Sequence, residues 1–264
     1  MTASDTYYRE HWERIDPEHI PIYEELFRWR PNMEPMITGA QIAPGLRVID
    51  YGCGPGFLAI ELAKRVGPSG RVVGCDLNEE FLLRARARAE SEGLAERVDW
   101  HHIVDGRIPA EDASVDRVIC KNVLEYVPDL HATLLEFRRV LKPGGLAHAI
   151  DSDWGALIIE PLGPERVARL LTAAQPAYKE PLAGRKLYGA MRQAGFGEVK
   201  LEVLARPDTR GLLFPIVMSL VMYAQEFGRL APDEADMITS DCQAAINDGT
   251  YMLFLPQFLV TGLK

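Results

Sequence analysis

The segment VIDYGCGPGF, residues 48–57, is the most informative part of the sequence. It joins a β-branched run that ends in Asp50 to glycines at 52, 54 and 56, and a helical pattern begins at Phe57. Gly52 permits a tight turn, and Gly54 and Gly56 leave room where a ligand must approach the backbone. This order of strand, glycine-rich turn and helix predicts a nucleotide-like ligand at the carboxyl end of the strand.

Two residues argue against a dinucleotide as this ligand. The dinucleotide fingerprint G-x-G-x-x-G requires glycine at position 57, where this chain has phenylalanine. The Asp50 carboxylate would also repel a pyrophosphate held beside the turn. A ligand that carries an ammonium group suits this position better.

Short β-branched runs alternate with longer helical patterns from about residue 46 onward. This alternation is typical of β-α-β units and predicts an α/β fold with an open, doubly wound parallel sheet. Helices are predicted near 57–66, 79–92 and 130–141. The predicted strands are 46–50, 71–75, 97–104, 115–120 and 146–151.

Acidic residues also end the second and third predicted strands. A carboxylate at Asp76 can accept hydrogen bonds from both hydroxyls of a ribose. Asp105 can accept from an exocyclic adenine amine, while the backbone N–H of Gly106 meets a ring nitrogen. Because the carboxyl ends of parallel strands line one crevice, these groups are expected to lie around one ligand.

The rest of the chain predicts helical additions to the sheet, with helices near 164–174 and 184–194 and a strand at 197–204. An insertion as long as 205–250 is expected to contain helices. The expected organisation is a helical N-terminal lid (1–40), a ligand-binding core (41–204), a helical insertion that caps the substrate (205–250) and the last strand of the core (251–264).

Composition excludes several classes of protein. The chain has 264 residues, is 47% hydrophobic and carries a formal net charge of −9, which makes it globular and disfavours nucleic acid as a partner. Its longest apolar run, 212–223, is interrupted by Pro215 and Ser219 and is too short for a membrane span. No secretion signal and no C-x-x-C pair is present, so a cytoplasmic protein without disulfides or membrane contact is expected.

Five segments together resemble a known family: VIDYGCGPG, VVGCDL, IVDGRIP, VICKNVLEYVPD and RVLKPGG. They are similar to the Rossmann-like S-adenosylmethionine-dependent methyltransferases, in the small-molecule branch that includes the ubiquinone and menaquinone methyltransferases. The resemblance implies a seven-stranded, mostly parallel sheet whose last strand is antiparallel. It also implies the cofactor contacts, with the methionine part held by Asp50 and Gly52 to Gly56, the ribose by Asp76 and Leu77, the adenine by Asp105 and Gly106, and Lys121 or Asn122 closing over the methionine.

This sequence lacks motifs of several related methyltransferase families, and these differences narrow the class of substrate. The run Cys120-Lys121-Asn122-Val123 stands where enzymes that methylate nucleic-acid bases carry an Asp/Asn-Pro-Pro-aromatic motif. Only Glu125 lies near the position of the paired-glutamate loop of protein arginine methyltransferases. Asp151 and Asp153 match a metal-dependent catechol-type site only in part, so no metal is expected.

The acceptor pocket is expected to come from the helical additions, because the strand ends are assigned to the cofactor. Acceptor contacts are predicted for Tyr8, Trp12, Trp154, Met218 and Met222. Core packing is the competing interpretation of each of these side chains. The apolar stretch 212–227 would face either a pocket or a second copy of the chain, which leaves a homodimer open.

The catalytic residue stays unassigned, because aligning acceptor, methyl and sulfur can suffice without a base. Candidates for a base are Asp151, Asp153, His148 and Tyr126. The leading hypothesis is methyl transfer to O, N or C of a small, largely apolar or aromatic metabolite. The alternatives are a cofactor-binding protein with rearrangement or pericyclic chemistry or a binding role, a nicotinamide dehydrogenase, and a nucleic-acid methyltransferase.

Overall fold

The computed structural model describes residues 5–264, and its central element is a seven-stranded sheet. Antiparallel pairing joins β9 to β5 and to β7, whereas the other pairs are parallel. This topology confirms the predicted α/β fold with an antiparallel last strand. In spatial order the strands are β3 (Val98–His102), β2 (Arg71–Asp76), β1 (Arg47–Tyr51), β4 (Val115–Lys121), β5 (Leu141–Ser152), β9 (Gln257–Leu263) and β7 (Gly197–Leu204).

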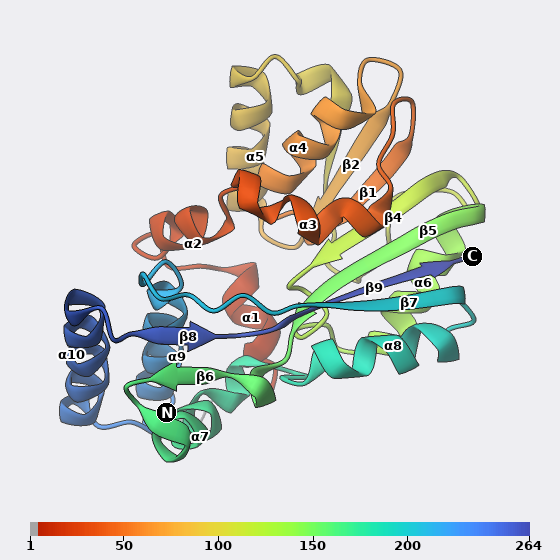
Figure 1. The fold of residues 1–264 in the computed structure, drawn as a ribbon. Coiled ribbons are helices and arrows are strands. Elements are labelled where there is room, and N and C mark those ends of the chain that lie inside the picture. The colour runs from red at the N-terminus through yellow and green to blue at the C-terminus, as the bar shows by residue number, and fades with distance from the viewer. Residues whose placement is uncertain (1–4) are drawn as a thin grey trace.

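Helices cover both faces of this sheet (Figure 1). Val48 of β1 belongs to the apolar cluster of one face, with α4 (Phe57–Val66) and α5 (Glu79–Ser91). Its neighbour Ile49 belongs to the cluster of the other face, with α6 (Leu130–Val140) and α8 (Ala183–Gln193). Because both faces are buried, the successive residues Val48 and Ile49 are both apolar, instead of one apolar and one polar.

A separate apolar cluster lies beyond the carboxyl edge of the sheet, and we call the body built around it the cap (Figure 1). Its residues extend from Trp154 to Leu255. It contains β6 (Ile158–Glu160), α7 (Gly163–Ala174), α9 (Phe214–Glu226), α10 (Pro232–Asp248) and β8 (Met252–Phe254).

The prediction of a single last strand over 251–264 is wrong, because two strands in two different sheets occupy it. Strand β8 pairs with β6 in the cap, and β9 pairs in the main sheet. Pro256 lies between them, where the missing backbone N–H interrupts a sheet ladder. Strand β6 was not predicted, since three residues are too few to show a periodicity.

Three N-terminal helices connect the sheet to the cap: α1 (Tyr7–Glu13), α2 (Ile20–Phe27) and the short α3 (Glu34–Ile37). The hydroxyl groups of Tyr23 in α2 and Tyr223 in α9 lie 3.0 Å apart. In Figure 1, α1 and α2 lie between the sheet and the cap helices. Short 3₁₀ helices occupy Pro31–Met33, Thr38–Ala40, Ala95–Arg97, Trp154–Ala156 and Gln175–Ala177.

Candidate active site

A cavity opens where β1, β2 and β4 end, and we call it the first cavity. The predicted cofactor residues that line it are Asp50, Gly52, Gly54, Asp76, Leu77, Lys121 and Asn122. Trp12, Phe27 and Trp29 of the N-terminal segment close it from above the sheet edge. The crossing order of the strands thus brings Asp50 and Asn122, which are 72 positions apart, onto one wall.

Two buried acceptor atoms in this wall have no partner in the part of the chain that the structure describes: Asp50 Oδ2 and Asn122 Oδ1. Asp50 is only 1% exposed, and burial, followed by the charge of Asp76, raises its pKa to about 7, although Lys121 opposes the shift. An unpaired buried acceptor is costly to the fold. Both atoms therefore fit an ammonium group such as that of S-adenosylmethionine.

The three glycines of the turn have different neighbours. A Cβ on Gly52 would lie 2.2 Å from Val123 Cγ2, and one on Gly56 would lie 2.7 Å from Ala85 Cβ. A Cβ on Gly54 would meet nothing closer than Phe27 Cδ2 at 3.8 Å. Close packing within the protein explains glycine at 52 and 56, whereas Gly54 leaves space in the cavity.

The Asp76 carboxylate organises the turn as well as facing the cavity. Its Oδ2 accepts from the backbone N–H of Gly54 at 2.7 Å, and its Oδ1 accepts from that of Asn78 at 2.9 Å. Burial raises the Asp76 pKa, and these hydrogen bonds oppose the shift. Since each carboxylate oxygen has two lone pairs, both can still accept from ribose hydroxyls.

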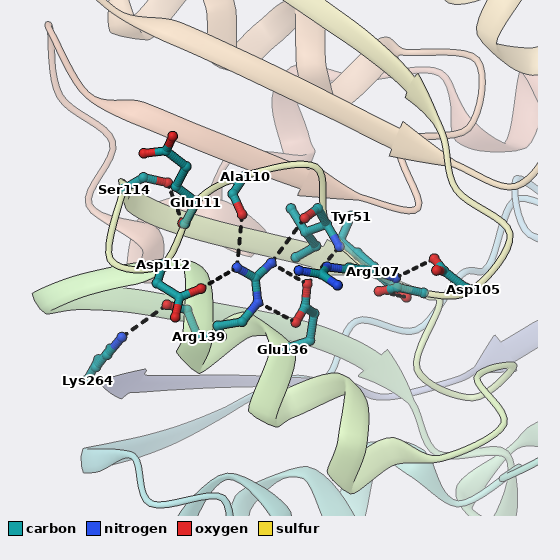
Figure 2. A network of polar contacts seen from close by, with 12 residues as sticks. Tyr51, Asp105, Arg107, Ala110, Glu111, Asp112, Ser114, Glu136, Arg139 and Lys264 are labelled. Atoms are coloured by element: carbon teal, nitrogen blue, oxygen red, sulfur yellow. Dashed lines mark hydrogen bonds and ion pairs between the residues drawn. The ribbon is translucent and has the colours of Figure 1, made fainter.

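The loop after β3 holds its two predicted adenine contacts outside the lining of this cavity. Asp105 is exposed, and its Oδ1 accepts from the backbone N–H of Arg107 at 3.0 Å. Arg139 of α6 holds the loop by donating hydrogen bonds to the carbonyl oxygens of Ile108 and Ala110 (Figure 2). The structure therefore places Asp105 and Gly106 beside the cavity rather than on its wall.

A second, larger cavity continues from the first toward the cap. Its lining is rich in aromatic residues. Ring centroids lie 5.1 Å apart for Trp12 and Tyr126, 5.6 Å for Tyr126 and Tyr178, and 4.8 Å for Tyr178 and Trp154. Residues that line both cavities are Trp12, Phe27, Met33, Lys121, Asn122 and Tyr126.

The other predicted acceptor residues lie outside both linings. Tyr8 is buried in α1, with Lys179 Nζ 5.2 Å from its ring centroid. Met222 packs against the cap cluster, and Met218 is 41% exposed. Helical spacing alone did not distinguish these side chains from Trp12, because it says nothing about which face meets the cavity.

Two of the base candidates are engaged away from the cavities. The His148 Nε2 atom lies 2.6 Å from the Met36 carbonyl oxygen, and burial lowers the His148 pKa. The Asp153 carboxylate forms an ion pair with Arg185, with 2.8 Å between Oδ1 and Nη2. Neither residue lines a cavity, whereas Tyr126 lines both.

Glu125 was not among the predicted site residues, although it lines the second cavity. It is 2% exposed, and Trp154 Nε1–H donates a hydrogen bond to its Oε2. Asp151 lies in the same buried network, where burial raises its pKa to about 7. The sequence signal was Glu125 inside the run LEYVPD, and that run does not reveal the distant Trp154.

A family model described as "Methyltransferase domain" matches residues 42–195. This range contains the ends of β1, β2 and β4 and therefore the strand-end residues of the first cavity.

Two sequence relatives are named as quinone methyltransferases. A "Ubiquinone biosynthesis O-methyltransferase" from Roseobacter denitrificans is 32% identical over 172 residues, covering 64% of each chain. A "2-phytyl-1,4-naphtoquinone methyltransferase" from Trichormus variabilis is 34% identical over 137 residues, covering 50% of this chain and 60% of the relative. The chain thus spans less than two thirds of the length of either relative.

A solved structure shares the fold over the whole chain. Phosphoethanolamine N-methyltransferase 2 from Haemonchus contortus, solved with S-adenosylhomocysteine, superposes with a TM-score of 0.65 at 18% identity. The match covers 100% of this chain and 60% of that one.

Proposed function

Because the chain belongs to the methyltransferase domain family, we propose that it transfers the methyl group of S-adenosylmethionine to a small, largely apolar or aromatic acceptor. The methylated atom is an oxygen, nitrogen or carbon. The first cavity holds the cofactor, and the second cavity holds the acceptor.

The observation that carries this proposal is the wall shared by the two cavities. Trp12, Lys121, Asn122 and Tyr126 line both of them. A cofactor held by its ammonium group at Asp50 would therefore lie next to the space lined by aromatic rings. When bound, S-adenosylmethionine supplies an electrophilic methyl group on a positively charged sulfur.

The residues of this chain hold and align the reactants. Asp50 and Asn122 bind the ammonium group, and Asp76 with Leu77 binds the ribose. Trp12 and Tyr126 orient the acceptor and exclude water, and rings beside a sulfonium add about 0.5–2 kcal/mol of cation–π attraction. Holding two reacting atoms at about 3–3.5 Å is itself a large part of catalysis.

The cap supplies the acceptor side of the site. We propose that it comprises 153–182 and 205–255, since both ranges contribute to one apolar cluster. Leu212, Leu213, Pro215 and Ile216 line the second cavity, which supports a pocket-facing role for the beginning of the 212–227 stretch. The adenine contacts of Asp105 and Gly106, the possibility of a homodimer, the cytoplasmic location and the absence of a nucleic-acid partner stay predictions. Within residues 5–264, no helix has the length and apolarity that a membrane span requires.

Isothermal titration calorimetry with S-adenosylhomocysteine and with NAD tests the cofactor assignment, and binding of NAD alone would overturn it. Incubation with S-adenosylmethionine labelled in its methyl group and a metabolite extract then tests the reaction. Transfer of label with accumulation of S-adenosylhomocysteine is expected. If the cofactor binds and no acceptor gains label, the non-methylating alternative replaces this proposal.

A further inference from the structure

Six buried carboxyl groups lie in or beside the site: Asp50, Asp76, Glu125, Asp151, Asp153 and Asp208. Both oxygens of Asp76, of Asp151 and of Asp208 accept backbone hydrogen bonds. Asp153 is paired with Arg185, and Asp50 faces the first cavity. Glu125 and Asp208 line the second cavity, and of these two it is Glu125 whose carboxyl group is hydrogen-bonded by side chains rather than by the backbone.

The protein holds Glu125 in place from two sides. Its backbone carbonyl oxygen accepts from the N–H groups of Lys179 and Glu180, each at 3.0 Å. Trp154 Nε1–H donates to the side-chain Oε2, and the Tyr126 hydroxyl is a second hydrogen-bonding neighbour of the carboxyl group. The carboxyl group is thus fixed against the aromatic wall of the second cavity.

The surroundings also set the proton affinity of this carboxyl group. Burial raises the Glu125 pKa well above its usual value, and the charge of Asp151 adds to the rise. Hydrogen bonds from Trp154 and Tyr126 and the charge of Lys121 oppose it. Burial, followed by the charge of Glu125, raises the Tyr178 pKa well above its usual value, so the Tyr178 hydroxyl group remains neutral.

We infer that Glu125 is the catalytic residue that takes the proton of the acceptor, and that the acceptor is therefore an alcohol, phenol or amine with its O–H or N–H group at the aromatic wall. The inference rests on the proposed function and makes it more specific. The acceptor's oxygen or nitrogen forms a bond to the methyl carbon while the carbon–sulfur bond breaks. The electron pair of the broken carbon–sulfur bond stays on sulfur. The acceptor's proton passes to the Glu125 carboxylate and then to solvent.

The experiment compares the full-length wild type with Glu125→Gln and Trp154→Phe. The probes are catechol, phenol, aniline and benzylamine, together with any acceptor identified from a metabolite extract. Glutamine keeps the size of Glu125 and an oxygen for the Trp154 N–H, but it cannot serve as the base. Circular dichroism and S-adenosylhomocysteine affinity, expected to stay within about threefold of wild type, verify that each variant folds.

Glu125→Gln is expected to lower turnover by about 10²–10⁴-fold, the usual contribution of a general base. Wild-type turnover should fall as the pH drops and Glu125 becomes protonated, and this acidic limb should be absent in the variant. Trp154→Phe removes a donor that stabilises the carboxylate, so it should move the limb to higher pH without abolishing it. Infrared difference spectra should show one protonated carboxyl band in wild type that is missing from Glu125→Gln, whereas the bands of Asp50 and Asp151 remain in both proteins.

Three outcomes overturn the inference. If Glu125→Gln has wild-type turnover and an unchanged acidic limb, Glu125 is not the base, while the proposed function stands. A product methylated on carbon would show that the acceptor does not react through an O–H or N–H group, which contradicts the inferred acceptor class. If the wild type binds S-adenosylhomocysteine but methylates neither the probes nor the extract, this inference and the proposed function both fail.

Discussion

Asn78 connects the end of β2 to the N-terminal helix above the site: its Nδ2 donates to the Trp12 carbonyl oxygen at 2.8 Å. The Oδ1 atom of the same side chain accepts from the backbone N–H of Phe81 at 2.9 Å and caps α5. One residue therefore stabilises a helix of the core and holds the backbone of an aromatic residue that lines both cavities.

Replacing Asn78 separates these two contributions. Asn78→Ser should keep an N-cap oxygen but not reach Trp12, whereas Asn78→Ala should lose both contacts. We expect both variants to raise the acceptor KM several-fold, and only Asn78→Ala to lose about 1 kcal/mol in the free energy of unfolding. Steady-state kinetics and urea unfolding measure the two effects. Wild-type KM in both variants would show that the contact with Trp12 does not shape the site.

Asp50 should make cofactor binding pH-dependent. Its pKa is raised to about 7, and only its ionised form pairs with an ammonium group. The affinity for S-adenosylhomocysteine should therefore weaken as the pH falls through about 7. The Asp50→Asn variant should bind S-adenosylhomocysteine at least about tenfold more weakly at pH 8. Its affinity should no longer change between pH 8 and pH 6 through the titration of the Asp50 carboxyl group. Calorimetry across this pH range is the measurement, and an equally steep dependence in Asp50→Asn would contradict the assignment.

The same shift predicts an opposite effect on the stability of the cofactor-free protein. The folded-state pKa of Asp50 lies above the unfolded value of about 3.9, so the fold favours the protonated form. The stabilising effect of protonation is present below the unfolded pKa and is lost as the pH rises through the folded pKa. Asp50→Asn should therefore have a higher melting temperature than wild type above pH 7 and a smaller advantage at pH 5. Thermal unfolding of wild type and Asp50→Asn at both pH values, with no cofactor added, tests whether the Asp50 carboxylate lowers the stability of the protein.

The turn glycines should respond differently to substitution. Gly54→Leu places a side chain in the first cavity and should weaken S-adenosylhomocysteine binding by at least about tenfold, with about 1–2 kcal/mol of backbone strain because φ is positive. Gly52→Ala should instead destabilise the fold, since its Cβ would overlap Val123. Val123→Ala in the Gly52→Ala background should recover part of that loss. Calorimetry and thermal unfolding report the two effects, and tight binding by folded Gly54→Leu would contradict the placement of the cofactor.

Arg139 should hold the loop that carries Asp105 and Gly106 (Figure 2). Arg139→Ala removes donors to the loop carbonyl groups and to Asp112, so hydrogen exchange over 106–113 should accelerate. If this loop contacts the adenine, S-adenosylhomocysteine affinity should also fall several-fold. Arg138 is the next residue of α6 and donates a hydrogen bond to the Gly195 carbonyl oxygen instead, so Arg138→Ala is the matched control. Faster exchange with unchanged affinity would remove Asp105 and Gly106 from the cofactor site.

Local patterns predicted the main sheet and the first cavity because those features depend on neighbours in sequence. The run VIDYGCGPGF shows its strand, turn and helix directly, and acids at strand ends gather wherever parallel strands share an edge. Asp50, Gly54 and Asp76 therefore line one cavity, whereas Asp105 and Gly106, which were expected in the same crevice, lie outside its lining.

The acceptor side could not be predicted in the same way. His148, Asp153 and Met218 carry suitable chemistry, but only the packing of distant elements shows that they lie outside the two cavities. Glu125 and Trp154 are 29 positions apart, and β6 meets β8 across more than 90 residues.

Short-range patterns of the sequence were enough to predict the parallel sheet and the strand ends that line the first cavity, because hydrophobic periodicity and glycine turns are local properties of the chain. Only the folded structure shows that, of the predicted acceptor residues, Trp12 and Trp154 line the second cavity and that Glu125 joins them there. That meeting depends on long-range packing of the N-terminal helices, the strand-end loop and the cap, and no local pattern specifies which of their faces come together.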